Sequence, residues 1–176
     1  MNHKEWDSRS TLEAHLKEQN RPSLIVGSDA EAPRKFYSVD LFFDSRSIRL
    51  GIICSGFGIL PSIFTFKKNE RILVGHDSAI TCVNLDSLKL EFVRRLSGPF
   101  YEFIDSQSTE DVIILYELGI LRLRLSGSLI WHTPTEVIEN FRITDNGQQI
   151  ILKLMDKNEC EIVNLETGAH SSLSSN

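Results

Sequence analysis

The chain has 176 residues, of which 41% are hydrophobic and 24% charged, and these proportions indicate one compact globular domain rather than a disordered chain. Its formal net charge is −5 and its basic residues are scattered, so we expect no nucleic-acid partner, which normally requires a basic patch. The three cysteines lie far apart and form no CxxC or Cys/His cluster, so we expect free thiols in a reducing compartment and no metal site.

The N-terminal segment, residues 1–22, is predicted to be a short amphipathic helix with its cap. Ser10 and Glu13 fit a capping box at the start of STLEAHLKEQN. Leu12 and Leu16 share one face of that helix. We expect this face to pack on the core of the chain itself, and binding of a partner by the helix is the alternative.

No segment is predicted to enter a membrane. The N-terminus, MNHKEWDSRSTLEAHLKEQN, is polar and lacks the apolar centre of a secretory signal. The longest apolar stretch, Leu50 to Phe64, is interrupted by glycines and a proline and is too short to span a bilayer. We therefore expect a cytoplasmic protein with no membrane partner.

From residue 23 onward the pattern changes to short strands rich in Ile, Val, Leu and Phe, separated by turn-forming residues. The turn signals include Ser126-Gly127 and Glu166-Thr167-Gly168. A chain with many strands and one helix belongs to the mainly β class. The predicted strands are, in chain order, SLIVGSD, FYSVDLFF, SIRLGII, RILVGHD, ITCVNL, LKLEFVRRL, VIILYEL, ILRLRL, SLIWHT, QIILKLMD and CEIVNL.

Similar segments about forty residues apart indicate internal repetition. In each of them a strand ends in a leucine that opens a small polar turn, at Leu85, Leu125 and Leu165. An apolar triplet precedes each of these strands, and an aromatic-containing strand precedes each triplet, with the sequences SIFTF, FYEFID and ENFRITD. A looser copy comes first, because LIVGSD from Leu24 is similar to ILVGHD from Ile72.

A period near forty with four antiparallel strands per unit is typical of β-propeller blades, which stack to cover their apolar faces. The last repeat ends a strand with NLETG, as blades of the WD40 and quinoprotein families end theirs with D-L-x-T-G. From Pro61 to Asn176, and more weakly back to Ser23, the chain resembles such blades. The resemblance implies architecture alone, because the regular WD dipeptide and the quinone-binding tryptophan pattern are missing, so we expect no cofactor.

We therefore expect a mainly β fold of repeated antiparallel four-stranded meanders, arranged as a small propeller-like body or a strongly twisted sandwich, with one short N-terminal helix. A single β-repeat domain, residues 23–176, holds units at about 23–60, 61–98, 99–137 and 138–176. A ring completed by dimerisation fits the same sequence, which makes a homodimer an alternative.

One candidate for chemistry is the pair His76 and Asp77 in VGHDSAIT. An Asp can orient an imidazole for general-base work, but adjacent residues in a strand point to opposite faces, so a turn must bring the two side chains together. The alternative function is that of a small hydrolase or a sugar-binding protein, with its pocket near His76, Asp77 and Trp131.

A second group of residues is expected to contact a protein partner. Trp131 is one candidate because exposed tryptophans are enriched in binding hot spots, and His132 follows it before a loop. The acidic residues Glu110, Asp111 and Glu117 can meet a basic partner, since charge complementarity speeds association. Glu110 and Asp111 are expected at a solvated hairpin tip.

No nucleophile, metal cluster or phosphate-binding loop stands out in the sequence, so we expect no enzymatic activity. The predicted function is that of a non-enzymatic protein-binding module, which presents a loop face or a sheet edge to another protein. In size, acidic charge and lack of catalytic motifs the chain resembles bacterial immunity proteins, which neutralise a cognate toxin, often a basic domain, by direct binding. The expected partner is accordingly another protein, with a basic toxin domain as the narrower prediction.

Overall fold

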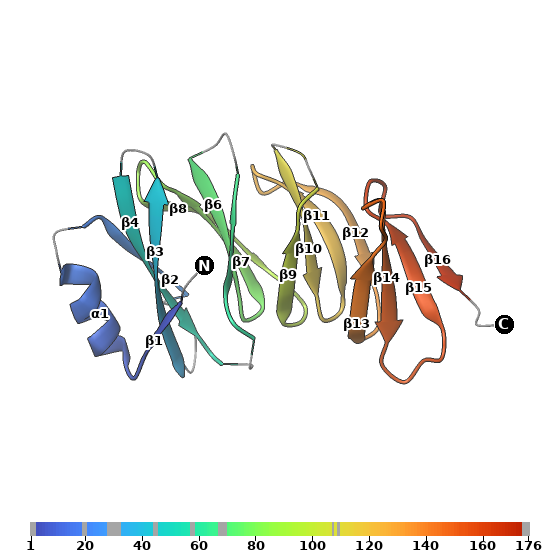
Figure 1. Ribbon diagram of the computed structural model, residues 1–176, viewed down its shortest axis with the longest axis horizontal. Coiled ribbons are helices and arrows are strands. Elements are labelled where there is room, and N and C mark those ends of the chain that lie inside the picture. Colours follow the sequence, from blue (N-terminus) through green and yellow to red (C-terminus); the bar gives the residue numbers. More distant parts are fainter. Residues whose placement is uncertain are drawn as a thin grey trace. The chain divides into compact units, whose positions relative to one another are not determined.

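A computed structural model of the protein describes residues 3–18, 21–27, 33–43, 46–56, 59–66, 70–106, 108 and 110–173. These residues form one helix and sixteen strands, and the strands make four four-stranded sheets (Figure 1). The mainly β fold with one short helix is therefore confirmed. The chain divides into two compact units, residues 1–94 and residues 95–176.

Sheet A, in the first unit, is not the antiparallel meander expected for the first repeat, the one least similar to the others in sequence. Its strand order is β1-β3-β4-β2, and β2 runs parallel to β4. The helix lies between β1 and β2 in the chain, so it connects the two edge strands of the sheet. The first strand also lies before residue 23, where the sequence places the start of this repeat. The strands are β1 (Lys4–Trp6), β2 (Ser23–Val26), β3 (Lys35–Phe43) and β4 (Arg46–Cys54).

The helix, α1 (Arg9–Lys17), begins at a different cap from the predicted one. Ser8 is the N-cap, its side chain accepts a hydrogen bond from the Thr11 N–H, and the Thr11 side chain accepts one from the Ser8 N–H. The predicted box at Ser10 and Glu13 is therefore wrong. Leu12 and Leu16 are buried against residues of sheet A, so packing of the helix on the chain's own core is confirmed. No helix in the described segments has the length and apolar character that a bilayer crossing requires.

Sheet B is a regular antiparallel meander with strand order β5-β6-β7-β8. Sheets A and B share one apolar core, in which Val39 and Leu50 of sheet A cluster with Ile72 and Val83 of sheet B. These four side chains are at most 1% exposed, so each sheet covers the apolar face of the other. The strands are β5 (Ser62–Thr65), β6 (Arg71–His76), β7 (Ala79–Asn84) and β8 (Lys89–Arg95).

The second unit contains two further antiparallel meanders, sheet C and sheet D. They too share a core, in which Ile113 and Leu115 of sheet C cluster with Ile150 and Leu152 of sheet D. The strands of sheet C are β9 (Phe100–Ile104), β10 (Asp111–Tyr116), β11 (Gly119–Arg124) and β12 (Leu129–Pro134). Those of sheet D are β13 (Ile138–Ile143), β14 (Gln149–Leu154), β15 (Cys160–Asn164) and β16 (His170–Leu173).

The repeated leucines occupy equivalent positions in sheets B, C and D. Leu85, Leu125 and Leu165 each follow the third strand of their sheet and are 3%, 6% and 5% exposed. In each case the leucine N–H donates to the carbonyl of the residue just before the second strand of that sheet. The three bonds run from Leu85 to Glu70 at 2.7 Å, from Leu125 to Glu110 at 2.7 Å and from Leu165 to Gln148 at 2.9 Å. The internal repeat is therefore a repeat of structure as well as of sequence.

Candidate interaction site

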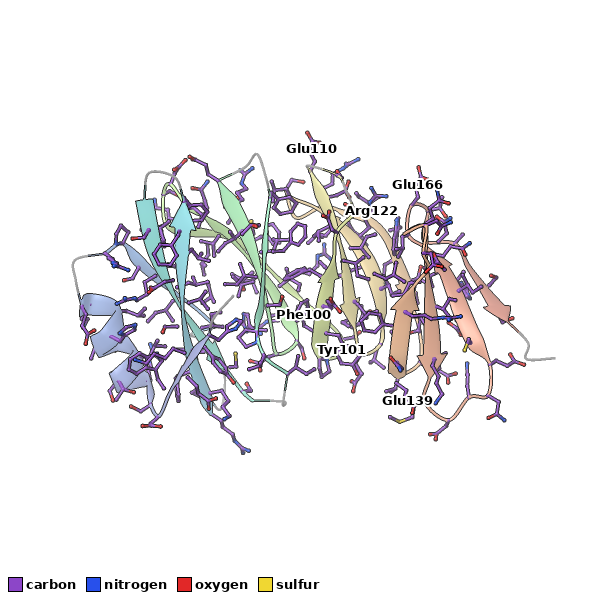
Figure 2. The ribbon with its side chains drawn as sticks, in the orientation of Figure 1. Phe100, Tyr101, Glu110, Arg122, Glu139 and Glu166 are labelled. Carbon is purple, nitrogen blue, oxygen red and sulfur yellow. The ribbon has the colours of Figure 1, made fainter. Side chains whose placement is uncertain are left out.

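A cleft of about 420 Å³ lies between sheets C and D within the second unit. Figure 2 shows Arg122 and Glu166, one from each sheet, at the same end of the strands, the upper end in this view. We call this feature the C/D cleft. Its volume falls within the range of protein ligand sites, about 300 to 1,000 Å³. The lining residues are Asp105, Ser106, Ile113, Arg122, Asn146, Gly147, Gln148, Asn164, Leu165 and Glu166.

Arg122, on β11, connects the two walls of the C/D cleft. Its Nε donates to Asp111 Oδ1 at 2.8 Å, and its Nη1 donates to the Glu166 carbonyl at 3.2 Å. The Arg122 and Asp111 side chains are only 17% and 13% exposed. Such a partly desolvated, hydrogen-bonded pair fixes side-chain positions better than an exposed ion pair does.

The Asp111 carboxylate has a second partner in Ser106, whose Oγ donates to it at 2.8 Å. Burial raises the pKa of the Asp111 carboxyl, but hydrogen bonds from Arg122 and serine side chains lower it by more, so the pKa lies below its ordinary value. Asp111 is the first residue of β10 and not part of a solvated tip, so that expectation is wrong for Asp111. Glu110, directly before it, is exposed.

Turn residues of sheet D form the opposite wall. The Asn146 side-chain oxygen accepts hydrogen bonds from the Gln148 N–H at 3.1 Å and from Thr144 Oγ1 at 2.7 Å. Gly147 between them has a φ of +67°, a conformation that favours glycine. Such side-chain-to-backbone bonds hold a turn in one conformation, so the polar groups of this wall are already in place before any ligand arrives.

Trp131, on β12, lies beside another turn of sheet D, the one that contains Glu166 and follows β15. Its Nε1 donates to the Glu166 carbonyl at 3.0 Å, the oxygen that also accepts from Arg122. Its ring lies against Gly168, at which a Cβ would come within 2.7 Å of Trp131 Cδ2. Much of the tryptophan is therefore covered by its own chain.

None of the five predicted partner-binding residues lines the C/D cleft, although Asp111 and Trp131 are hydrogen-bonded to residues that do. His132 Nε2 is 2.7 Å from the Tyr116 hydroxyl, and the two rings stack. Tyr116 ends β10, and Glu117 follows it in the turn to β11, at the opposite end of the strand from Asp111. The predicted residues thus divide between the two ends of sheet C.

His76 and Asp77 lie in the first unit, and their side chains do approach each other. Asp77 is in the turn after β6 with a φ of +45°, and its Oδ2 is 3.8 Å from His76 Nδ1. Both Asp77 carboxylate oxygens accept from the Ser55 N–H, at 2.9 and 2.8 Å. Burial raises the pKa of Asp77, but the neighbouring imidazole and the Ser55 N–H lower it by more, so the pKa lies below its ordinary value. Neither residue lines the C/D cleft.

None of the residues that line the C/D cleft was predicted from the sequence, neither Arg122 nor the turn residues of sheet D. The sequence does mark the turns themselves, because Asn146 and Asn164 lie in the turn segments that separate strands of the last repeat. By themselves those turns indicate only connections between strands. No sequence pattern marks Arg122 as a site residue. Its partner Asp111 lies eleven positions away in a hairpin, and only the structure defines the register of that hairpin.

No protein-family model matches the chain, and no curated protein matches it. Among solved structures, the WD40 domain of Pan2 from Neurospora crassa aligns with a TM-score of 0.49 and 19% identity over 65% of this chain and 37% of that chain. The β-propeller domain of Cps50 (Swd1) from Myceliophteria thermophila aligns with a TM-score of 0.49 and 10% identity, over 63% and 36%. Hydrazine synthase from Kuenenia stuttgartiensis aligns with a TM-score of 0.45 and 7% identity, over 60% and 33%.

The alignments cover about a third of the length of each of those chains. The geometry of this chain itself carries the fold assignment. Sheets B, C and D are antiparallel four-stranded meanders that repeat in sequence order, and neighbouring sheets within each unit bury their apolar faces against each other. They are propeller-like blades, as the sequence resemblance implies.

Proposed function

We propose that the chain is a non-enzymatic protein-binding module and that the C/D cleft receives a polar loop of a partner protein. The observation that carries the proposal is the preformed polar lining of this cleft, with Arg122 fixed by Asp111 and the Asn146 turn fixed by its own side chain. Sites whose groups are already ordered bind with a smaller entropic cost. Polar and charged groups at the edge of an interface favour one partner over others.

The chemistry of the lining favours a protein loop over a small organic ligand. Pockets for small molecules are lined mainly by hydrophobic and aromatic side chains around a few polar groups. Among the described residues that line the C/D cleft, none is aromatic, and Ile113 and Leu165 are the apolar side chains. A surface of amides, carboxylates and a guanidinium matches the polar groups of a turn in another protein.

The same lining does not favour catalysis. Ser106 is hydrogen-bonded to the Asp111 carboxylate, an arrangement in which a strong base could activate a nucleophile. The Asp111 carboxylate, however, is also bound by Arg122, which holds its pKa below the ordinary value, so it is a weak base. Ser106 in this setting orders the cleft and is not activated for attack.

The charge around the C/D cleft supports a basic partner. Asp105 and Glu166 line the cleft, and Glu110 lies at the same end of the strands (Figure 2). Arg122 is paired with Asp111, so its positive charge is largely neutralised. With a net charge of −5 on the whole chain, a basic loop would be attracted before contact.

The test uses the full chain, immobilised and exposed to an extract of its own source cell, with bound proteins identified and then purified for direct binding. Gln148→Arg places a long side chain in the C/D cleft, since Gln148 is exposed on its wall. Ser172→Arg adds the same charge on the exposed edge strand β16 and serves as the control. We expect Gln148→Arg to weaken binding at least about tenfold and Ser172→Arg to leave it unchanged. Equal binding by both variants and the wild type would refute the cleft as the site.

Two narrower predictions belong to this proposal. The first is that the partner is a basic toxin domain that the chain neutralises by direct binding, as an immunity protein does. This prediction rests on size and acidic charge. Its check is whether the purified partner is toxic when produced alone and harmless when produced together with this chain. The second is homodimer formation, which sedimentation of the purified chain over a range of concentrations tests.

A further inference from the structure

We propose that Cys54, His76 and Asp77 form a binding site for one divalent transition-metal ion of the zinc type. One ligand atom from each residue, the Cys54 sulfur, a His76 ring nitrogen and an Asp77 carboxylate oxygen, lies within 4.8 Å of the other two. Cys54 and His76 are buried, and Asp77 is partly buried. This site belongs to the first unit and is independent of the C/D cleft in the second.

The fold brings these residues together from two sheets. Cys54 is the last residue of β4 in sheet A, and His76 is the last residue of β6 in sheet B. The Asp77 carboxylate accepts the Ser55 N–H, which ties the turn after β6 to the end of β4. Gly27 lets its backbone lie close to both His76 and the end of β4. A Cβ there would lie 3.1 Å from His76 Cε1 and 2.1 Å from the Ile53 carbonyl oxygen.

The imidazole of His76 has one satisfied nitrogen and one unsatisfied nitrogen. Nε2 lies 3.3 Å from Thr81 Oγ1, which is within hydrogen-bond reach. Nδ1 is buried and has no hydrogen-bond partner among the described residues, since Asp77 Oδ2 is 3.8 Å away. A buried polar atom without a partner is costly, and a metal ion coordinated by Nδ1 removes that cost. Metal-binding histidines commonly hold their other nitrogen in such a hydrogen bond, which fixes the ring orientation.

The donor set determines the class of ion. A thiolate, an imidazole and a carboxylate together favour Zn²⁺ and its analogue Co²⁺, whereas Mg²⁺ and Ca²⁺ prefer oxygen ligands alone. Three protein ligands leave a fourth position of a tetrahedral ion for water. Donor atoms around tetrahedral zinc lie about 3.5 Å apart, so the ion draws these side chains inward from their present separations.

Metal binding must displace the thiol proton. Burial, together with the negative charge of Asp77, raises the pKa of Cys54 to about 12, so the thiol is protonated at neutral pH without a metal. On binding, the sulfur–hydrogen bond breaks, a sulfur–metal bond forms and the proton passes to buffer. Another titratable residue near the site is Tyr37 of β3, whose pKa is raised mainly by burial, so it remains a neutral phenol.

The experiment titrates the purified full chain, freed of metal with a chelator, with Co²⁺ and then with Zn²⁺. We expect saturation at one ion per chain, a thiolate-to-cobalt charge-transfer band in the near ultraviolet, intense visible bands of a four-coordinate ion, and loss of these bands when Zn²⁺ is added. We also expect release of a proton on binding. Failure of the wild-type chain to bind either ion saturably would overturn the proposal.

Variants separate this site from other thiols. Cys54→Ser should abolish the charge-transfer band, whereas Cys82→Ser should retain it. Cys82 is a matched control because it is buried, its pKa is likewise raised to about 12, and its sulfur faces Glu91 at 3.7 Å. A band that survives Cys54→Ser, or that disappears in Cys82→Ser, contradicts the proposal.

A third variant covers the case in which Cys54→Ser does not fold. Asp77→Asn keeps a side-chain oxygen for the Ser55 N–H and removes only the charge. We expect at least about tenfold weaker Co²⁺ binding by this variant than by the wild type, compared at a temperature at which both metal-free chains are folded. Binding equal to that of the wild type would mean that the Asp77 carboxylate serves only to fix the turn, and the proposed site would be refuted.

Discussion

The indole of Trp131 rests on Gly168, with no room for a side chain between them: a Cβ at Gly168 would lie 2.7 Å from Trp131 Cδ2 and 2.8 Å from Cε3. The tryptophan belongs to sheet C and the glycine to the turn before β16 of sheet D. The contact therefore joins the two sheets on one side of the C/D cleft, next to the Glu166 carbonyl that accepts from Trp131 and Arg122. It gives Trp131 a structural role in addition to its predicted role in binding.

Gly168→Ala tests this contact. Gly168 has a φ of +73°, which costs about 1 kcal/mol for a residue with a Cβ, and the clash with Trp131 adds to that cost. We expect a loss of about 2 to 4 kcal/mol in the free energy of unfolding, measured by denaturant titration. Gly147→Ala is the control, because Gly147 has a similar φ of +67° but a Cβ there would meet nothing within 4 Å. It should lose only about 1 kcal/mol, and equal losses would show that the Trp131 contact does not matter.

Asp111→Asn tests the charge that pairs with Arg122, a residue of the C/D cleft. The folded-state pKa of Asp111 lies below that of the unfolded chain, so the carboxylate stabilises the fold above about pH 4 and this contribution disappears as the pH falls through the folded-state pKa. We expect the variant to be less stable than the wild type by about 1 to 3 kcal/mol at pH 7. The difference should shrink in denaturant titrations as the pH is lowered below about 4, through the folded-state pKa.

Glu139→Gln is the control for that experiment. Glu139 pairs with Lys153 at 2.8 Å, but the Lys153 and Glu139 side chains are 55% and 47% exposed, so solvent screens the pair. This variant should match the wild type at every pH. A stability difference for Asp111→Asn that stays constant down to low pH would mean that the charge of the carboxylate contributes nothing.

Arg49→Met tests the buried cation that attaches α1 to sheet A. The Arg49 side chain is 4% exposed, its Nε donates to Asp40 at 2.8 Å, and its Nη1 donates to the His15 carbonyl near the end of the helix at 2.8 Å. Methionine keeps much of the volume and removes the donors, so we expect a loss of about 2 to 4 kcal/mol, with faster amide exchange in α1 than in the wild type.

Arg9→Met provides the comparison. Arg9 pairs with Glu13 within α1 at 2.7 Å, but the two side chains are 51% and 37% exposed. Such a pair contributes about 0.3 to 0.5 kcal/mol, so this variant should be nearly as stable as the wild type. If Arg49→Met behaves like Arg9→Met, the hydrogen bonds of Arg49 do not hold the helix, and apolar packing around Leu12 and Leu16 does.

The strands could be predicted from the sequence because their signals are local. Alternating apolar residues and turn residues around Leu85, Leu125 and Leu165 define hairpins without reference to distant parts of the chain. Sheet A was harder to foresee. Its β1 has only three residues and lies in a polar segment, and its pairing with β3 joins positions about thirty residues or more apart. A parallel partner for β4 cannot be recognised from the pattern of β2 itself.

The candidate sites depend on contacts that the sequence does not display. Arg122 and Asp111 meet because β10 and β11 pair in one register, and Cys54 reaches His76 because two sheets pack against each other. The spacing of twenty-two residues between Cys54 and His76 matches no metal-binding motif, so the sequence predicted no metal there. For Asp77, the sequence indicated that only a turn could bring it to His76, and the φ of +45° at Asp77 provides that turn.

The start of α1 offers a direct comparison between sequence and structure. The sequence favours Ser10 as the cap, whereas the structure places the cap at Ser8, which accepts from the Thr11 N–H at 3.2 Å. Ser8→Ala should therefore cost about 1 kcal/mol of unfolding free energy, since it leaves a helix N–H without its partner. Ser10→Ala should change stability by about a few tenths of a kcal/mol at most, because alanine is favourable inside a helix and Ser10 only contacts the Ser8 hydroxyl. Denaturant titrations of the two variants side by side decide between the caps, and a larger loss for Ser10→Ala would restore the sequence-based prediction.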